Sequence, residues 1–489
     1  MRLSILCDSL GLTLPCGSDK IEINNVRSNS KEVRKGDLFV CVSGLTTDGH
    51  KYVADAEKNG AAVIISEREI ETNLPLIICE NTRRILPRLY SAFYSHPEEK
   101  LKIIGVTGTN GKTTVTYLLE AIFSLTGYKT GVIGTIESRI DGKRISLDGK
   151  GTKNMTTPDP EELFKTLSYM ANNGVKYVFM EVSSHALALD KLDGLTFLCG
   201  IFTNLTPEHM DFHSDMEDYF VSKRKLFDMA EIKVVNVDDE YGKMLASLYD
   251  GCVTCSLHCE TADCHALNIN SLGVNGAEWD FASVSSRFKI RSRMIGEYNI
   301  MNSLEAAACA LKLGISPYKI KDALGFINGV KGRLERVKIG FPCDFSVFID
   351  YAHTPDALKK VLKTVKENMS LSERLVLLFG CGGDRDKSKR RVMGEIASQY
   401  ADFIIVTSDN SRSEEPRAII SEIEKGISDK NYIIIENRRE AIEYSIHNAR
   451  KGDVILLSGK GHEEYEINKS GKHPFCERDI VKDAFTGRK

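Results

Sequence analysis

The chain has 489 residues, of which 42% are hydrophobic and 27% charged, and its net charge of −3 shows no basic excess. These values are ordinary for a globular protein and argue against a dedicated nucleic-acid binder. No apolar run approaches the roughly 18 residues of a membrane span, and the N-terminus lacks the features of a signal peptide. We therefore expect a cytoplasmic protein of about three domains, at roughly 150 residues per domain, whose 13 cysteine residues are reduced.

Short β-branched runs alternate with amphipathic stretches along most of the chain. The runs predict strands at residues 62–66, 76–79, 103–106, 177–182, 197–203, 234–237, 345–349, 375–379, 403–407, 432–435 and 454–457. The amphipathic stretches predict helices at residues 113–125, 159–172, 355–369 and 417–425. Continuous apolar strands separated by helices are typical of parallel sheets, so we predict an α/β fold throughout. Residues 252–293 are polar and alternating, which predicts some antiparallel strands there.

Two short segments are candidate domain boundaries. Residues 95–100 (SHPEEK) are polar and carry a proline, and residues 325–332 (GFINGVKG) carry three glycines. These segments predict domains at 1–97, 98–330 and 331–489.

The strongest chemical signal is the segment 103–114, IIGVTGTNGKTT. A strand followed by a glycine-rich turn and a helix points backbone N–H groups and the helix dipole at an anion. Lys112 would neutralise the β and γ phosphates of a nucleotide and Thr113 would reach Mg²⁺, but motors, GTPases, kinases and ligases all use such a loop. Because Val106 stands where a strict Walker A motif has glycine, the match is to a shortened Gly-x-x-Gly-Lys-Thr form; the alternative is a glycine-rich turn with a surface lysine. The predicted ATP-binding residues here are Gly108, Thr109, Asn110, Gly111, Lys112, Thr113 and Thr114.

Two further residues follow predicted strands. Glu181 ends the run YVFMEV, and His209 lies a few residues after the next run. The carboxyl ends of parallel strands meet at one edge of a sheet, where open α/β sheets bind ligands. We therefore predict Glu181 as a metal ligand, with a helix-capping acid as the alternative, and His209 as a neighbour at the same edge. Lys223 lies in a short helical pattern that by itself indicates only a basic helix face.

These segments resemble the Mur ligases. The motifs that carry the resemblance are TGTNGKTT, MEVSSHAL, TNLTPEHMDFH, Lys223, GEYNIMNSLEAA, GRLERV, DYAHTPDAL, GCGGDRDKSKR and SGKGHEEY, in that order along nearly the whole chain. The resemblance implies a small N-terminal α/β domain that binds a UDP-sugar, a central ATP-binding domain with a P-loop-type, mostly parallel sheet, and a C-terminal Rossmann-like α/β domain that binds an amino acid.

The likeness is strongest to the branch of the family that adds the third peptide residue. It implies ATP-dependent addition of meso-2,6-diaminopimelate to the D-Glu γ-carboxylate of UDP-MurNAc-L-Ala-D-Glu, through an acyl phosphate, in peptidoglycan precursor synthesis. The implied catalytic residues are Lys112, Glu181, His209 and Lys223. The implied Mg²⁺ site consists of Thr113, Glu181, His209 and a carbamylated Lys223. Only small-molecule partners are implied, and we expect a monomer without a membrane span.

The resemblance also assigns substrate contacts. Asn299 and Asn302 match positions near the adenine, and Arg333, Asp350 and His353 match nucleotide contacts from the third domain. In the run Asp409-Asn410-Ser411-Arg412, the arginine would pair with the distal carboxylate of diaminopimelate, for which its planar fork is suited. Further diaminopimelate contacts are implied for Arg385, Gly459 and Glu463. The contacts implied for the UDP-MurNAc-dipeptide are Ser28, Ser30, Thr156, Thr157, Ser183 and Lys191.

Several positions depart from the family pattern. Ser411 stands where the family has proline, and we expect weaker amino-acid binding or a more mobile loop. Leu189 and Lys191 stand where glutamine and arginine are usual, Met155 replaces asparagine, and Lys31 replaces arginine. These changes leave open a related ligase for another amino acid or acceptor, such as an L-lysine-adding or secondary-metabolite enzyme. The DNSR and GKGHEEY motifs argue against a folylpolyglutamate-synthase-like enzyme. A non-enzymatic nucleotide-binding regulator is disfavoured, because the catalytic groups are all retained.

A group of cysteine and histidine residues resembles a zinc site in its residue types and spacing. Its members are Cys252, Cys255, His258, Cys259, Cys264 and His265. The usual second Cys-x-x-Cys pair is missing, and strand alternation would send neighbouring thiols to opposite faces. We therefore do not predict a metal there.

Overall fold

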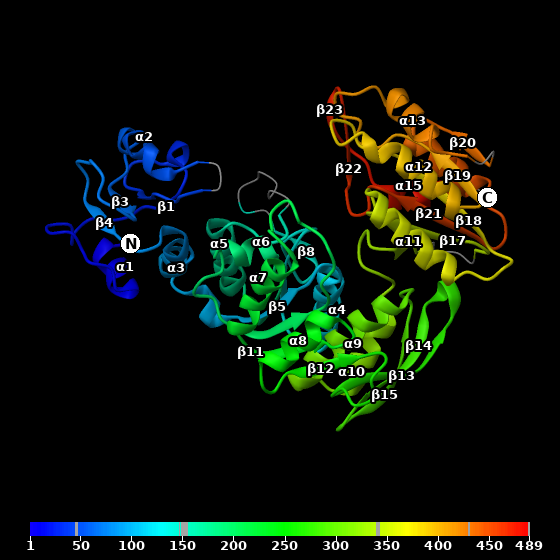
Figure 1. Cartoon of the computed structure of the whole chain (residues 1–489), viewed down its shortest axis with the longest axis horizontal. Helices are drawn as coiled ribbons and strands as arrows, with labels where there is room; N and C mark the ends of the chain where they lie inside the picture. The colour runs from blue at the N-terminus through cyan, green and yellow to red at the C-terminus, as the bar shows by residue number, and fades with distance from the viewer. Residues whose placement is uncertain (45–46, 146, 148–154, 339–342, 429–430, 488–489) are drawn as a thin grey trace. The chain divides into compact units, whose positions relative to one another are not determined.

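The computed structural model describes residues 1–44, 47–145, 147, 155–338, 343–428 and 431–487 (Figure 1). The chain forms two compact units. The first comprises Met1–Cys264 and Glu305–Lys319, and the second comprises His265–Leu304 and Ile320–Lys489. No helix within the described ranges has the length and apolar character needed to cross a membrane.

The N-terminal part of the first unit is a four-stranded parallel sheet in the order β1-β2-β3-β4. Its strands are β1 (Val26–Arg27), β2 (Leu38–Val40), β3 (Val63–Ser66) and β4 (Leu76–Ile78), and its helices are α1 (Leu3–Leu10), α2 (Val53–Lys58) and α3 (Thr82–Phe93). Helix α3 begins where the Asn81 side chain accepts the Arg84 N–H. It buries Leu89 and Tyr90 completely, as expected for an amphipathic helix against a core.

The remainder of the first unit is built on a larger sheet in the order β12-β11-β10-β5-β9-β6-β7-β8. Its strands are β5 (Lys102–Thr107), β6 (Thr130–Ile133), β7 (Arg139–Ile140), β8 (Lys143–Arg144), β9 (Tyr177–Glu181), β10 (Phe197–Phe202), β11 (Ala230–Asn236) and β12 (Val253–Ser256). Its helices are α4 (Lys112–Leu125), α5 (Pro160–Asn172), α6 (Ser184–Ala188), α7 (Met216–Asp228) and α8 (Glu240–Leu248).

The register of this sheet determines which residues meet at its edge. Val106 of β5 lies opposite Glu181 of β9 on one side and Ile201 of β10 on the other, and both pairings are parallel. The three strands therefore end together. The phosphate loop, Glu181 and the loop that carries His209 all leave the sheet at this edge, as the sequence predicted.

The second unit contains a hairpin and a second α/β layer. The structure has β13 (Cys264–Ser271), β14 (Ala277–Ser283), β15 (Arg287–Ser292), α9 (Glu297–Lys312) and α10 (Pro317–Phe326), and β14 and β15 pair in antiparallel fashion. The first residue of β13, the last part of α9 and the start of α10 belong to the first unit. The antiparallel strands predicted for residues 252–293 are confirmed.

A six-stranded sheet follows in the order β16-β17-β21-β18-β19-β20, parallel except for β16. Its strands are β16 (Glu335–Arg336), β17 (Ser346–Asp350), β18 (Arg374–Phe379), β19 (Phe403–Val406), β20 (Tyr432–Ile434) and β21 (Asp453–Ser458). The helices are α11 (Pro355–Glu367), α12 (Ser388–Tyr400), α13 (Pro416–Glu424), α14 (Arg438–His447) and α15 (Glu477–Gly487). A hairpin of β22 (Tyr465–Asn468) and β23 (Gly471–Pro474) precedes α15.

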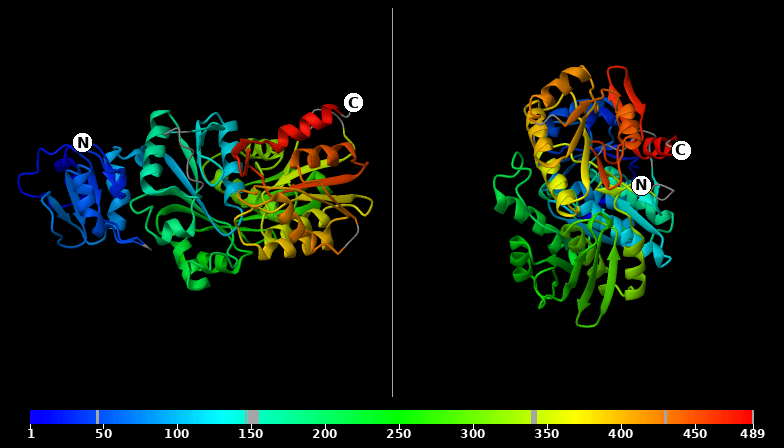
Figure 2. Two further views of the ribbon diagram at one scale, coloured as in Figure 1. Left: turned by 90° about the horizontal axis from the view of Figure 1, so that it is seen from above. Right: turned by 90° about the vertical axis from the view of Figure 1, so that its right-hand side faces the viewer.

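Two apolar layers sandwich this sheet because its strand residues alternate between faces. Leu375 and Leu377 pack with α11, α12 and α13, whereas Val376 and Leu378 pack with α14 and α15. Figure 2 shows α15 and α11 on opposite sides of the strands. The predicted α/β fold class is confirmed, whereas the boundaries of the domains 1–97, 98–330 and 331–489 stay predictions.

Candidate active site

The phosphate loop joins β5 to α4. Gly108 has a φ of 146° and leaves no room for a side chain, because a Cβ there would overlap Thr203 Oγ1. The Thr109 N–H donates to the Asn204 carbonyl at 2.9 Å. Lys112 folds over the loop, and its Nζ donates to the carbonyls of Gly108 at 2.8 Å and Thr109 at 2.9 Å. The lysine ammonium therefore lies on the loop that is predicted to hold phosphate.

The rest of the loop is positioned in the same way. The Asn110 N–H donates to Asn204 Oδ1 at 3.0 Å, and Gly111 caps α4 in a left-handed conformation. Thr113 and Thr114 are buried in the first turn of the helix. Thr203 and Asn204, which hold the loop in place, begin the motif TNLTPEHMDFH, but this role was not predicted from the sequence.

Lys223, on α7, is a buried amine beside the phosphate loop. Its side chain is 1% exposed, and its Nζ donates to the Gly108 carbonyl at 2.9 Å. The ammonium also lies 4.6 Å from the centre of the Tyr219 ring. Burial, reinforced by the nearby charge of Lys112, lowers the pKa of Lys223 well below its usual value. The helix therefore holds a lysine that readily becomes a neutral amine.

Glu181 is the centre of a hydrogen-bonded group of threonines. Its carboxylate accepts the Thr135 N–H at 3.1 Å and the Thr135 hydroxyl at 3.0 Å, and the Thr135 hydroxyl also lies 3.1 Å from Thr156 Oγ1. The Thr157 hydroxyl donates to the Glu181 carbonyl and accepts the Ser183 N–H, each at 2.9 Å. Three residues predicted to contact the peptide thus adjoin the predicted metal ligand. Thr135 was missed because nothing local marks it.

His209 belongs to a cluster of histidines. Its ring lies 4.9 Å from that of His185, and the ring of His213 lies 5.9 Å from His185. Burial lowers the pKa of His209, the charge of Glu208 opposes this, and the cationic charge of Lys112 lowers that pKa further. His209 is therefore biased toward the neutral form, in which a ring nitrogen can act as a ligand.

The metal ligands predicted at this edge are Thr113, Glu181, His209 and Lys223. Within the described ranges, no set of three His, Cys, Asp or Glu side chains is arranged to hold a metal ion. Mg²⁺ in phosphate sites commonly takes one or two carboxylates and completes its shell with substrate oxygens and water. A buried carboxylate, a helix-terminal hydroxyl and an amine able to become a carbamate fit such an ion.

A cavity of about 1490 Å³ lies elsewhere in the first unit. Ser28, Leu189 and Lys191 are among its lining residues, and Lys191 Nζ lies 2.6 Å from Asp159 Oδ1. Ser30 is buried, and it does not appear among the residues that line the cavity. Of the six predicted UDP-sugar contacts, two therefore line this cavity, while Thr156, Thr157 and Ser183 surround Glu181.

Asn299 and Asn302 lie in the first turns of α9 and are both buried. The Asn299 side chain donates to the Ile295 carbonyl at 2.8 Å, and Asn302 Nδ2 donates to Asn299 Oδ1 at 3.3 Å. The two predicted adenine contacts therefore form one rigid pair.

Asp350 ends β17 and organises the backbone around it. Its carboxylate accepts the N–H of Leu334 at 2.6 Å and that of Ala352 at 2.8 Å. Burial raises the pKa of Asp350, and the charge of Arg333 opposes this rise.

Arg333 and His353 converge on one aromatic ring. The Arg333 guanidinium lies 5.3 Å from the centre of the Tyr351 ring, and the His353 ring lies 4.6 Å from it. The structure thus groups the predicted nucleotide contacts of the third domain around β17.

The run 409–412 follows β19 and is fixed by hydrogen bonds. Asn410 Oδ1 accepts from Lys460 Nζ at 3.0 Å and from the Ile467 N–H at 2.9 Å, and Asn410 Nδ2 donates to Glu463 at 2.8 Å. Burial by itself raises the pKa of Asp409, but the charges of Lys460, at 3.4 Å, and Arg438 together with the Asn410 N–H hold the pKa below its usual value. Lys460 is fully buried, and the sequence did not suggest this role.

Two other predicted contacts in this region have packing roles. Gly459 is required sterically, because a Cβ there would lie 2.6 Å from Asp409 Oδ2. Ser411 is only 3% exposed. The hydrogen bonds of Asn410 to Lys460, Glu463 and Ile467 order this loop, in which Ser411 stands where the family has proline.

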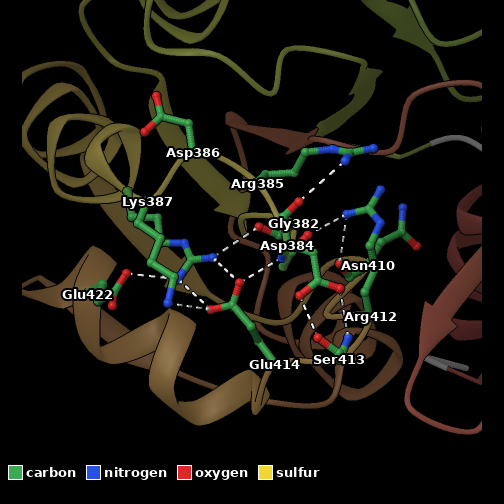
Figure 3. Close-up of polar contacts among 12 residues, drawn as sticks. Gly382, Asp384, Arg385, Asp386, Lys387, Asn410, Arg412, Ser413, Glu414 and Glu422 are labelled. Carbon is green, nitrogen blue, oxygen red and sulfur yellow. Dashed lines mark hydrogen bonds and ion pairs between the residues drawn. The ribbon is translucent and has the colours of Figure 1, made fainter.

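Arg412 and Arg385 lie on two neighbouring loops (Figure 3). Arg412 Nη1 donates to the Gly383 carbonyl at 2.8 Å, while the guanidinium of Arg385 donates to the Asp384 carbonyl at 3.3 Å. The Ser413 N–H donates to Asp384 at 3.1 Å and joins the two loops. Both guanidinium groups thus contact neutral carbonyl oxygens, which suits them to receive a carboxylate.

Arg390 of α12 stabilises these loops through two ion pairs. Its buried guanidinium pairs with Glu414 at 2.9 Å and Glu422 at 2.8 Å. Glu414 also accepts the Asp384 N–H at 2.6 Å. The hydrogen bonds from Arg390 and Asp384 lower the pKa of Glu414 to about 2, so that it stays ionised at neutral pH.

Replacing Lys460 with methionine should destabilise the second unit by about 3 kcal/mol at pH 7, because it leaves the buried Asp409 without its nearest counter-charge. The folded-state pKa of Asp409 lies below its unfolded-state pKa. Its pairing therefore stabilises the fold fully at pH values above the unfolded-state pKa, and this stabilisation is lost as the pH falls through the folded-state pKa. The difference from the wild type should therefore narrow below about pH 4. Urea unfolding measures both effects.

Lys469→Met is the matched control, because Lys469 and its partner Glu415 are exposed. It should change the free energy of unfolding by less than about 1 kcal/mol. Equal effects of the two substitutions would contradict the assigned role of Lys460.

Comparison with known proteins identifies the class. Three family models match successive segments: "Mur ligase family, catalytic domain" over residues 22–98, "Mur ligase middle domain" over 106–310, and "Mur ligase, glutamate ligase domain" over 332–461. The chain belongs to the Mur ligase family.

Individual relatives indicate which branch of the family the chain resembles. The chain is 41% identical to UDP-N-acetylmuramoyl-L-alanyl-D-glutamate–2,6-diaminopimelate ligase 1 of Clostridium acetobutylicum, over 99% of both chains. It is 42% identical to the 2,6-diaminopimelate ligase of Caldanaerobacter subterraneus subsp. tengcongensis, over 96% of this chain and 95% of the relative. A solved structure of a ligase of the same name superimposes with a TM-score of 0.74 at 28% identity, covering 100% of this chain and 99% of that one.

Proposed function

We propose that this chain is an ATP-dependent, ADP-forming ligase that adds meso-2,6-diaminopimelate to the D-Glu γ-carboxylate of UDP-MurNAc-L-Ala-D-Glu. The observation that carries the proposal is the 41% identity, over 99% of both chains, to a ligase named for this acceptor and this amino acid. The proposed reaction belongs to peptidoglycan precursor synthesis in the cytoplasm. Its partners are small molecules only.

ATP binds at the phosphate loop in this proposal. The backbone from Gly108 to Thr114 and the start of α4 surround the phosphates, and Lys112 leaves the loop carbonyls to contact them. Support comes from the way Thr203 and Asn204 hold the loop in shape. The adenine contacts Asn299 and Asn302 in this assignment. Arg333, Asp350 and His353 contribute the remaining nucleotide contacts.

Lys223 acts as a carbamate. Its neutral amine attacks CO₂, an N–C bond forms, one C=O π bond opens to an oxyanion and the nitrogen loses a proton, so that the neutral amine becomes an anionic carbamate. The low pKa that burial and Lys112 give this amine supports the modification. With Thr113, Glu181 and His209 it would hold Mg²⁺, which when bound neutralises charge on the phosphate oxygens.

The chemistry proceeds by two displacements. A γ-carboxylate oxygen of D-Glu attacks the γ-phosphorus of ATP, the bond from that phosphorus to ADP breaks, and an acyl phosphate forms. The amine of diaminopimelate then attacks the acyl carbon, loses a proton and expels inorganic phosphate. Lys112 stabilises the charge that develops on the transferred phosphoryl group. Thr156, Thr157 and Ser183, beside Glu181, position the acceptor peptide, while Ser28, Ser30 and Lys191 serve the UDP-sugar end.

Diaminopimelate binds at the loops of the C-terminal sheet in this proposal. Arg412 and Arg385 bind a carboxylate, and Glu463 receives the ammonium end. The carbonyl-bound guanidinium groups and the hydrogen bond between Asn410 and Glu463 support this arrangement. Asp409, Ser411 and Gly459 shape the pocket.

Phosphate release from ATP tests the proposal. The assay uses UDP-MurNAc-L-Ala-D-Glu and compares meso-diaminopimelate, L-lysine and no amino acid. We expect much faster turnover with diaminopimelate than with L-lysine or without an amino acid, because only diaminopimelate offers a distal carboxylate to Arg412. Turnover with lysine instead would contradict the proposed amino acid.

One observation favours a second candidate, a related ligase with a different acceptor. Leu189 and Lys191 line the 1490 Å³ cavity, and Lys191 is engaged with Asp159. Leucine offers no hydrogen bond and lysine no bidentate fork to a sugar or phosphate. If no amino acid supported phosphate release from ATP, that result would favour this second candidate.

A further inference from the structure

A second cavity, of about 800 Å³, lies in the second unit. Arg291 of β15, Arg293 just beyond it, Lys321 of α10 and Arg336 of β16 are among its lining residues. None of the residues proposed to contact the nucleotide or the amino acid lines it. The residues that line this basic cavity are therefore distinct from those proposed for the ligase site.

The charges of the basic cavity are poorly balanced. The only acidic residue among those that line it is Asp322. Arg291 has a partner outside the lining, Glu278, at 3.5 Å. Within the described part of the chain, no carboxylate pairs with Arg293, whose guanidinium donates to the neutral Asn328 side chain at 2.7 Å.

Arg336 is the most enclosed of these groups. Its guanidinium is half-buried and donates to Asn275 Oδ1 at 2.8 Å and to Ser346 Oγ at 2.9 Å. Both partners are neutral, so they orient the fork without cancelling its charge. Burial lowers the pKa of Arg336, the Cys343 thiol opposes this, and the nearby charge of Arg293 adds to the lowering.

The volume of the basic cavity and the exposed residues that line it indicate the kind of ligand that it could bind. Small-molecule sites usually enclose about 300–1,000 Å³, and this cavity falls within that range. Phe326 at the cavity is 70% exposed, which leaves an apolar surface for the organic part of a ligand. We propose that the basic cavity is a second binding site for a small molecule that carries adjacent phosphate groups, gripped by Arg293, Lys321 and Arg336.

Calorimetric titration of the full-length protein with inorganic pyrophosphate tests this site. Lys112→Ala is introduced first, so that the phosphate loop contributes little binding. We expect one pyrophosphate site to remain in that background. Adding Arg293→Gln and Lys321→Gln should weaken this binding about tenfold or more, because each removes a charged hydrogen-bond donor. Both residues are exposed, so their replacement spares the core.

The chain offers a matched control. Lys289 lies on β15, the strand that ends next to Arg293, and Lys319 lies on the same helix as Lys321; neither lysine lines the cavity. Lys289→Gln with Lys319→Gln removes the same net charge and should leave the affinity within about twofold. Equal weakening by both pairs, or no pyrophosphate binding in the Lys112→Ala background, would overturn the proposal. Neither result depends on the ligase reaction.

Discussion

Replacing Lys223 with alanine should lower ATP-dependent phosphate release by about 10²–10³-fold, the usual cost of removing one group that stabilises charge in a transition state. The loss arises because alanine cannot form the carbamate proposed to hold Mg²⁺. The buried space left beside Gly108 should then admit a small carboxylate. Formate or acetate should therefore restore part of the variant's rate but leave the wild type unchanged.

Lys225→Ala is the control for this substitution. Lys225 lies on the same helix, but it is partly exposed and pairs with Asp190 at 2.9 Å. We expect close to wild-type turnover from this variant. Wild-type turnover by Lys223→Ala would contradict the assignment, and a loss that no carboxylate rescues would limit Lys223 to a packing role.

Replacing Arg412 with methionine should lower kcat/KM for meso-diaminopimelate by about 10²–10⁴-fold. Two hydrogen bonds to a carboxylate are lost, each worth roughly 1.5–3 kcal/mol. The rate with L-lysine, which has no distal carboxylate, should change little. The preference for diaminopimelate over lysine therefore falls, and competition between the two amino acids measures it directly.

Arg417→Met is the matched control, because Arg417 lies on the following helix with its side chain exposed. It should leave the preference for diaminopimelate unchanged. If Arg412→Met reduced turnover with both amino acids equally, the arginine would hold the loop in place rather than choose the amino acid. The bond from Arg412 to the Gly383 carbonyl makes that distinction necessary.

Local patterns predicted the fold well. The runs at 375–379 and 403–407 correspond to β18 and β19, because a strand buried on both faces must be apolar throughout. Shorter strands escaped prediction. β1 and β2 contain only Val26–Arg27 and Leu38–Val40, which are too short to show a period.

The candidate site was only partly predictable. The phosphate loop is contiguous, so its residue spacing is visible in the sequence. Lys223 looks like one of several lysines on a basic helix, and only the fold shows that it is 1% exposed. The partners Thr135 of Glu181 and Lys460 of Asp409 lie 46 and 51 positions away, and no local rule links them.

The serine at position 411 illustrates the same limit. From sequence, loss of proline predicts a looser loop, because proline restricts the unfolded chain. The structure shows that Asn410 bonds to Lys460, Glu463 and Ile467 and holds the same segment.

Transfer of oxygen from substrate to phosphate tests the proposed ligase reaction most directly. UDP-MurNAc-L-Ala-D-Glu labelled with ¹⁸O in both γ-carboxylate oxygens is incubated with ATP, Mg²⁺ and meso-diaminopimelate, and the released phosphate is analysed by mass spectrometry. An acyl phosphate intermediate requires one labelled oxygen in each phosphate and one in the amide product. Unlabelled phosphate would show that ATP is hydrolysed by water and would contradict the proposed function.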